Sequence, residues 1–291
     1  MNRKGITLIE LLVALSISGI LVAGVYRTFV SQQHTYTVQD QVVDMQQNVR
    51  LAINRMTREI RMANFGKQLY VNAGRTYGDP LYYNDDFFKK GGAMYGTFSN
   101  VITPGVGGTS VTVVGGYQTL TTLSANATTG SNTIQVNDAS GFDMGSKKYI
   151  SINGTESFQI QTINGNQIEL KDVLSEDHSA LEPVYLVMAI TYSWGMSEGK
   201  TCLLRDDNLG LVPAQPVAED IESLQFRYVM NTGETLDVVP NARLDDIRMI
   251  QVTITAITDR DRPDPELAKV GDGFRRRTLT SNIQLRNLLF L

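Results

Sequence analysis

The sequence predicts an α+β protein in which one long N-terminal helix packs on an antiparallel β-sheet head. The stretch from Val25 to Phe65 contains no glycine or proline, and its apolar residues recur at steps of three and four. The second half of the chain contains runs that alternate apolar and polar residues, which is typical of strands with one buried face. These two patterns, in this order, predict helix first and sheet second.

The helix is expected to run from Ile6 to Asn64, with Phe65-Gly66 as its end. At 1.5 Å per residue it would be roughly 90 Å long. Its first part, residues 6–30, is almost wholly apolar and long enough to cross the hydrocarbon core of a bilayer. Its second part, residues 31–65, is amphipathic. The apolar stripe of this second part consists of Val38, Val42, Met45, Val49, Ile53, Met56, Ile60 and Ala63.

The apolar segment has three competing explanations. It can be a permanent membrane anchor, or a secretory signal peptide that is cleaved near Val22-Ala23-Gly24. In the third, only a short leader is removed and the helix remains. The basic residues in 1–5 predict that this end stays in the cytoplasm. Glu10 favours the third explanation, because a carboxylate in lipid costs roughly 2.5 kcal/mol or more and has no evident use in a discarded peptide.

The residues around Glu10 resemble the signature of type IV prepilins. Gly5-Ile6-Thr7-Leu8-Ile9-Glu10-Leu11-Leu12-Val13 follows its order, with Ile6 where phenylalanine is usual. The resemblance implies that residues 1–5 are a leader, that a prepilin peptidase cuts between Gly5 and Ile6, and that Ile6 becomes N-methylated. It also places Glu10 at the position of the family's glutamate.

Cleavage would leave a positive α-amine on Ile6, four residues before Glu10. A carboxylate in a low-dielectric medium is stabilised by such a charge, and neighbouring subunits of a helical bundle can supply one. Glu10 is therefore interpreted as a residue that sets the register between subunits of a filament. The alternative is a glutamate near the membrane surface that reaches the lipid headgroups.

Residues 116–180 are rich in Thr, Ser, Asn and Gly and are interpreted as an inserted β-rich module. Asn153-Gly154 and Asn164-Gly165 each separate two alternating runs, which is a strong hairpin signal. A meander of three or four strands, or a small barrel, is expected. Residues 66–115 and 181–291 are assigned to the head, with the aromatic residues between Tyr77 and Phe88 packing on the long helix or forming an exposed loop.

The head is expected to be an antiparallel sheet that covers the apolar stripe of the helix. Val217–Ile221 is interpreted as a helical turn. The expected strands are Val184–Ile190, Lys200–Arg205, Ser223–Met230, Ile250–Ala256 and Thr278–Leu289, the last with Leu279, Ile283 and Leu285 facing inward.

Two segments of the second half, Val217–Tyr228 and Leu279–Leu288, look like parts of PilW-like minor pilins. Related segments occur in the J-type pseudopilins of type II secretion. The inserted module departs from the compact pseudopilin pattern and favours the pilus. The resemblance implies a subunit that primes pilus assembly or sits near the pilus tip.

The composition argues against other classes of protein. A net charge of −4 without a recurring basic stripe excludes nucleic acid as an expected partner. The sequence contains no recognisable catalytic motif, so neither an enzyme nor a cofactor is expected. The single cysteine, Cys202, lies in an apolar strand and is interpreted as a core residue, and His178 is interpreted as part of a solvated loop.

No metal site is expected, and one acidic run is only a weak candidate for calcium. Asp259, Asp261, Asp264 and Glu266 could supply oxygens to Ca²⁺, but arginines interleave and a solvated loop is preferred. The run Arg275-Arg276-Arg277 could contact phospholipid or an acidic partner, but a charged strand edge is preferred.

The sequence thus predicts a minor pilin, anchored by a single helix in the inner membrane with its head in the periplasm or outside, and then incorporated into a pilus. Its expected partners are other pilins and minor pilins, the prepilin peptidase, the assembly platform of the inner membrane and the lipid bilayer. A pseudopilin of a type II secretion system and a pilus-borne adhesin that binds through residues 116–180 are the alternatives.

Overall fold

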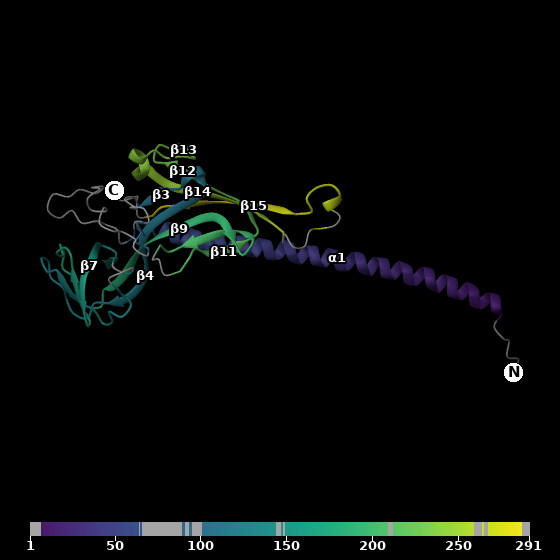
Figure 1. The fold of residues 1–291 in the computed structure, drawn as a ribbon, viewed down its shortest axis with the longest axis horizontal. Helices are drawn as coiled ribbons and strands as arrows, with labels where there is room; N and C mark the ends of the chain where they lie inside the picture. The colour runs from purple at the N-terminus through teal and green to yellow at the C-terminus, as the bar shows by residue number, and fades with distance from the viewer. Residues whose placement is uncertain are drawn as a thin grey trace. The chain divides into compact units, whose positions relative to one another are not determined.

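A computed structural model describes residues 7–63, 65, 89–90, 93–94, 101–143, 147, 149–208, 212–258, 264 and 267–286 (Figure 1). The chain divides into two compact units. The first comprises residues 1–47 and 258–275, and the second comprises residues 48–257 and 276–291. The helix α1 (Leu8–Arg61) contributes residues to both units.

The strands and 3₁₀ helices that follow α1 are listed here in chain order. They are β1 (Lys89–Lys90), β2 (Ala93–Met94), β3 (Ile102–Pro104), η1 (Val106–Gly108), β4 (Ser110–Thr122), β5 (Thr133–Gln135), β6 (Tyr149–Ile152), β7 (Glu156–Asn164), β8 (Gln167–Leu170), β9 (Pro183–Ser197), β10 (Lys200–Asp206), β11 (Gln215–Glu219), β12 (Ile221–Met230), β13 (Thr235–Leu236), η2 (Asn241–Asp246), β14 (Ile247–Ile257), η3 (Leu267–Lys269) and β15 (Arg276–Gln284).

The helix α1 is continuous over 54 residues, which confirms the long helix to within three residues at each end. After Arg61 the chain tightens into a turn, in which Met62 N–H and Ala63 N–H donate to carbonyls three residues earlier. The stripe predicted from the periodicity is largely correct, but Ala52 is fully buried where Ile53 is only half-buried. The buried members are Met45, Val49, Ala52, Met56, Ile60 and Ala63.

In the first unit, the described residues among 258–275 are held by hydrogen bonds to one another and by contact with α1. Thr258 N–H donates to the Arg275 carbonyl at 3.0 Å. The carboxylate of Asp264 is only 4% exposed; it forms an ion pair with Arg275 at 3.1 Å and lies 3.5 Å from Nε2 of His34 of α1. A buried carboxylate needs polar partners, and here one of them comes from the helix.

The larger sheet of the second unit is built around β4 and β9. These two strands pair antiparallel from Ser110↔Ser193 to Thr122↔Pro183. On its other side, β9 pairs with β10 along its second half and with β6 along its first half. The long strands β4 and β9 therefore belong both to the head and to the predicted inserted module.

The module is a small closed barrel rather than a simple meander. Starting from β4, the pairs run β4–β9–β6–β7–β8–β5, and an isolated bridge between Leu123 and Val136 joins the end of β5 back to the end of β4. Its interior is a single cluster of buried apolar side chains drawn from residues 123–184. Both predicted hairpins are present, β6–β7 and β7–β8, and Asn153 and Gly154 adopt positive φ in the first.

The second sheet has the order β13-β12-β14-β15, all antiparallel. The strict alternation of β14 and β12 is explained by this sheet, because Phe226, Val252 and Ile254 are fully or almost fully buried while their neighbours in sequence are not. In β15 and just after it, Ile283 and Leu285 are buried as predicted. Leu279 is only half-buried.

Two glycines of β4 let the end of α1 lie directly against the larger sheet of the second unit. A Cβ on Gly115 would approach the carbonyl oxygen of Met62 to 2.4 Å. The next residue, Gly116, donates its N–H to the Phe65 carbonyl at 2.6 Å. Any side chain at position 115 would separate these two backbones.

One sequence prediction for the second unit was wrong. Val217–Ile221 is no helical turn, because residues 215–219 form β11 and pair with β10, for example Leu203 with Ala218. Asp220 then adopts a positive φ of 56°, which turns the chain sharply into β12 of the other sheet. Five residues are too few to distinguish periods of two and 3.6. The aromatic residues between 77 and 88 lie outside the described part of the chain.

Candidate functional site

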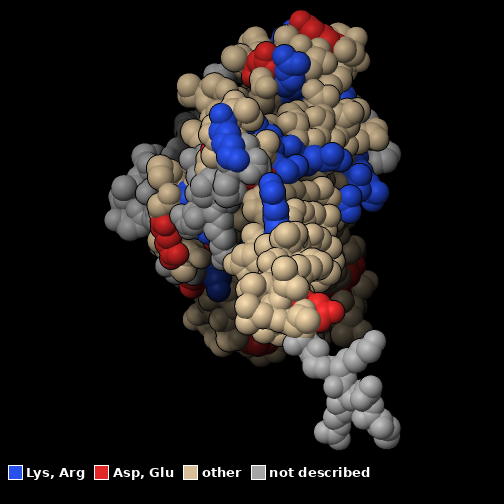
Figure 2. All heavy atoms as spheres, turned by 90° about the vertical axis from the view of Figure 1, so that its right-hand side faces the viewer, with Lys and Arg blue, Asp and Glu red and all other residues tan. Residues whose placement is uncertain are grey.

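The first part of α1 presents an apolar surface that no described residue covers. Large apolar side chains from Leu8 to Val30 are 46–78% exposed, and the most apolar 18-residue window of the helix is not buried at all. Figure 2 looks at the end of the molecule where α1 begins and shows a mostly uncharged surface there. A helix of this length and composition can cross a membrane, and such a surface is stable only in lipid or against other apolar helices.

Two hydroxyl side chains within this apolar part form hydrogen bonds to carbonyls of their own helix. The Ser16 hydroxyl donates to the Leu12 carbonyl at 2.8 Å, and the Thr28 hydroxyl donates to the Gly24 carbonyl at 3.0 Å. These bonds leave no hydroxyl hydrogen that must be satisfied by water. Ser16 and Thr28 therefore do not prevent this part of α1 from entering lipid.

Glu10 and Thr7 form a capping box at the start of α1. The Thr7 N–H and hydroxyl both donate to Glu10 Oε2 at 3.0 Å, and the Glu10 N–H donates to the Thr7 hydroxyl at 3.3 Å. This arrangement satisfies backbone donors of the first turn. The sequence signal was available, since Thr-x-x-Glu before an apolar run is the capping-box pattern, but the interpretation of Glu10 as a registry residue did not consider it.

The carboxylate of Glu10 can form further contacts, and this is relevant to its role in assembly. Within the described residues, Oε1 of Glu10 accepts no hydrogen bond and neither oxygen forms an ion pair. Oε1 of the capping carboxylate therefore remains available for a further contact, while Oε2 keeps its bonds to Thr7. The cleavage site, Gly5 and Ile6, lies outside the described residues.

Residues 1–26 match the family described as the prokaryotic N-terminal methylation motif. The match supports a type IV pilin-like protein. The motif indicates a prepilin-type precursor that is processed by a prepilin peptidase and assembles with other pilins, and it belongs to structural proteins rather than to a family of enzymes. Together with the apolar helix, the motif indicates anchoring by a single membrane span. No curated protein and no solved structure matches the chain.

The structure also gives partners for other residues that the sequence singles out. Asp264, one of four calcium candidates, is paired with Arg275 and His34, while Asp259, Asp261 and Glu266 lie outside the described residues. A Ca²⁺ ion at Asp264 would have to compete with the guanidinium of Arg275 and displace the imidazole of His34.

Cys202 lies in β10, and Arg276 and Arg277 of the arginine run lie in β15. Cys202 is 1% exposed, and burial raises the pKa of its thiol, which suits a small core residue. Arg276 begins β15 and binds the carboxylate of Glu222 through two nitrogens at 2.8 Å each. One member of the run is therefore paired across the second sheet.

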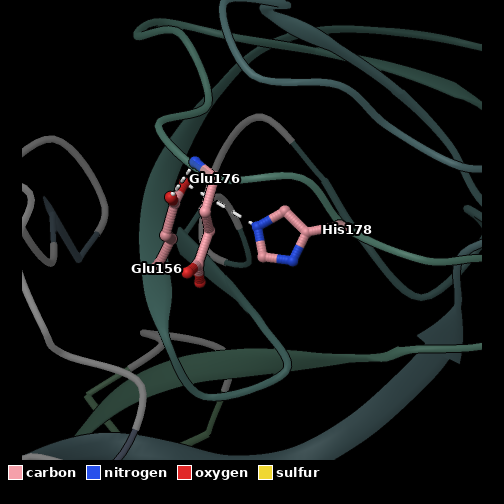
Figure 3. Close-up of side chains that lie close together, drawn as sticks. All are labelled: Glu156, Glu176 and His178. Carbon is pink, nitrogen blue, oxygen red and sulfur yellow. Dashed lines mark hydrogen bonds and ion pairs between the residues drawn. The ribbon is translucent and has the colours of Figure 1, made fainter.

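The interpretation of His178 as part of a solvated loop was wrong. The residue is 3% exposed, and its Nδ1 lies 2.8 Å from Glu182 Oε2 while its Nε2 lies 3.8 Å from Glu156 Oε2 (Figure 3). Burial by itself would lower the pKa of His178, but the contacts with Glu156 and Glu182 outweigh it and raise the pKa above its ordinary value. Hydrophilic neighbours in sequence gave no sign that the barrel would enclose this ring.

Glu156 is the buried partner that the sequence did not reveal. It starts β7 and is 1% exposed. Burial would raise the pKa of its carboxyl, but the nearby imidazole of His178 and the hydrogen bonds from Ser175 hold the pKa below its ordinary value. A charged glutamate thus lies inside the barrel end, next to the imidazole.

Proposed function

We propose that this chain is a minor pilin that takes part in the assembly of a type IV pilus, as a priming or near-tip subunit. The observation that carries the proposal is the methylation motif at residues 1–26 on an apolar helix that no described residue covers. The leader is removed between Gly5 and Ile6, Ile6 is methylated, and the helix holds the subunit in the inner membrane until it joins a filament. The work of the protein is helix packing and contact between heads.

Glu10 directs this packing by charge. Once the leader is gone, the α-amine of Ile6 and the carboxylate of Glu10 carry opposite charges within a largely apolar bundle. In a low dielectric an unpaired carboxylate is costly, and pairing with the amine of a neighbouring subunit relieves that cost. Because Oε2 caps the helix and Oε1 has no hydrogen bond within the described residues, a second subunit can bind Glu10 without unwinding the first turn.

The first test is the intact mass and N-terminal sequence of the protein extracted from cells with an active prepilin peptidase. The expected chain begins at N-methylated Ile6. A chain that begins at Met1 would instead be a simple anchored protein, and one that begins near Val25 would be a secreted protein. Either start contradicts the proposal.

A second test separates the charge of Glu10 from its capping role. Glu10→Gln removes the charge but keeps an N3 side chain that can complete a capping box, whereas Thr7→Val removes the cap and keeps the charge. We expect Glu10→Gln to insert normally into membranes but to be depleted in sheared pili at least 10-fold, and Thr7→Val to incorporate nearly normally. Normal incorporation of Glu10→Gln, or equal loss in both variants, would refute the registry role.

The barrel favours a pilus over a secretion pseudopilus, because it adds a separately packed cluster of apolar residues beyond the sheet of the head. Gly116 and Val187 are register partners in β4 and β9, so deletion of residues 117–186 can be closed with a two-residue Asn-Gly turn. Loss of pili in this deletion supports a role of the barrel in assembly. Normal pili with lost adhesion would instead identify the chain as an adhesin.

Cells that produce this protein can also be used to distinguish a type IV pilus subunit from a subunit of a type II secretion pseudopilus. A minor pilin is recovered with pili sheared from the cell surface, and its deletion lowers pilus number. A pseudopilin stays with the envelope, and its deletion abolishes type II secretion while pili remain, which would reassign this chain to the secretion machine.

A further inference from the structure

The imidazole of His178 is held in one orientation by Glu182. Its Nδ1 lies 2.8 Å from Glu182 Oε2, and the other oxygen of that carboxylate accepts the Ser179 N–H at 3.1 Å. A carboxylate at this distance fixes the proton on Nδ1. In the neutral ring the lone pair is then on Nε2, and a carboxylate behind a histidine in this way is the usual support of a metal-binding imidazole.

The Nε2 atom of His178 is buried and has no hydrogen-bond partner among the described residues. It faces Glu156 Oε2 at 3.8 Å, which is too long for a hydrogen bond. Two electron-rich atoms in a buried place repel one another unless a cation lies between them. The geometry of this pair therefore requires a positive charge, either a proton on the ring or a metal ion.

The carboxylate of Glu156 is oriented so that one oxygen remains available. Its Oε1 accepts hydrogen bonds from the Ser175 hydroxyl, from the Ser175 N–H at 3.2 Å and from the Glu176 N–H at 2.9 Å. Its Oε2 accepts only the second, longer branch of the Ser175 N–H bond, at 3.3 Å, and is directed toward His178. The loop that contains residues 175–178 thus donates most of its hydrogen bonds to Oε1 and leaves Oε2 available to a cation.

Glu176 supplies a third donor from the exposed side. Its carboxylate, Glu156 and His178 each place one ligand atom within 4.8 Å of the other two. Figure 3 shows both glutamates on the same side of the imidazole ring. Because Glu176 is exposed, its side chain can rotate inward without disturbing the barrel core.

We propose that Glu156, Glu176 and His178 bind one divalent first-row transition metal ion, with Zn²⁺ as the best match, and that Glu182 is the positioning residue of the imidazole. One nitrogen and two carboxylate oxygens form a donor set that suits Zn²⁺ rather than Ca²⁺ or Mg²⁺. Metal–ligand bonds of about 2.0–2.2 Å span ligand separations up to roughly 4 Å, so an ion fits between Nε2 and Oε2.

This site departs from the sequence-based expectation of no metal, and it does not depend on the proposed role in a pilus. Its effect would be local. The ion would join the first residue of β7 to residues 176–178, on a loop that closes the barrel, and leave a position for water on the exposed side.

The test uses the full-length protein in detergent after treatment with a chelator. We expect Zn²⁺ to bind with a stoichiometry of one per chain in a calorimetric titration and to raise the unfolding temperature. We also expect Co²⁺, as a spectroscopic substitute, to give ligand-field bands in the visible range. Glu176→Gln, which changes an exposed side chain and keeps the fold, should weaken Zn²⁺ binding at least 10-fold, and His178→Gln should abolish it.

Two matched controls complete the design. Asp177→Asn lies between two of the ligands, but Asp177 accepts the N–H and hydroxyl of Thr129 at 2.8 Å each, so Zn²⁺ binding should persist. His34→Gln removes the other of the two histidines and should leave binding unchanged. No stoichiometric binding by the wild type, or unchanged affinity in Glu176→Gln, would overturn the proposal and identify His178 as a buried imidazolium held by carboxylates alone.

Discussion

Replacement of Glu59 by alanine is expected to destabilise the second unit more than any nearby surface change. Glu59 lies on α1 and accepts two bonds from Arg205 Nε, at 2.9 and 3.1 Å, and one from the Tyr192 hydroxyl at 2.6 Å. The side chains of Glu59 and Arg205 are each only 15% exposed. Alanine therefore leaves a largely buried guanidinium and a fully buried hydroxyl without their acceptor.

The size of the effect follows from these contacts. Removal of one partner from a buried ion pair costs about 3–5 kcal/mol, and partial exposure of Arg205 places the cost near the lower end. The orphaned Tyr192 hydroxyl adds about 1 kcal/mol, because an unpaired buried donor loses its hydration without compensation. The sum of about 4 kcal/mol is a large share of the 5–15 kcal/mol that stabilise typical domains.

Urea unfolding of the full-length chain in mild detergent measures this directly. Trp194 is the only tryptophan, and its ring N–H donates to the Ile221 carbonyl at 2.9 Å, so its fluorescence reports on the sheets. With a slope near 3 kcal/mol per M, the unfolding midpoint should fall by about 1.3 M. Glu59→Met combined with Arg205→Met removes both charges and should be less destabilised than Glu59→Ala. A midpoint within about 0.3 M of wild type in Glu59→Ala, or additive losses in the double variant, would show that the network does not stabilise the fold.

Three further outcomes are expected. Gly115→Ala should lower the stability by about 2 kcal/mol or more in the same urea assay, because its Cβ would meet the Met62 carbonyl oxygen at 2.4 Å. Cys202, whose thiol pKa is raised by burial, should react with a thiol reagent at least 100-fold more slowly in native protein than in urea. The hydrogen bond and charge of Arg227 hold the pKa of Asp237 below its ordinary value, so NMR should find a higher Asp237 pKa in Arg227→Gln. The stability that this pair contributes should be present above about pH 4. It should be lost as the pH falls through the lowered pKa of Asp237.

Each of the three predictions has either a control variant or a result that would contradict it. Gly271→Ala, whose Cβ would have its nearest neighbour at 3.7 Å, should leave stability unchanged. Equal rates of thiol modification in native and unfolded chains would show that Cys202 is accessible. An unchanged Asp237 pKa in the arginine variant would show that the exposed pair does not form in solution.

The sequence predicted the features that depend on local repetition. A period of 3.6 without glycine or proline extended far enough to define α1, and Asn-Gly pairs located both hairpins of the barrel. Alternation also located β14, because one of its faces is buried. These patterns are local, so they can be recognised without knowing which other segments the helix or strand packs against.

Features that depend on distant partners were not visible. The pairing of β11 with β10 overrode the helical interpretation of Val217–Ile221. The buried ring of His178 lies beside the carboxylate of Glu156, a residue 22 positions earlier in the sequence. No pattern in a single sequence predicts a contact between residues so far apart. At the candidate assembly site, the methylation motif was recognised from its residues, whereas the capping role of Glu10 was missed although the spacing to Thr7 was present in the sequence.

The continuous strands β4 and β9 have a mechanical consequence. The barrel is attached by two covalent backbones that are also hydrogen-bonded to one another, from Ser110↔Ser193 to Thr122↔Pro183. Tension applied at the barrel along the strands is carried by the peptide bonds of both backbones. The ladder between β4 and β9 shifts register between Gly116 and Gln118 and again between Thr119 and Thr121, so bending of the barrel against the sheet is expected to concentrate at these two irregularities.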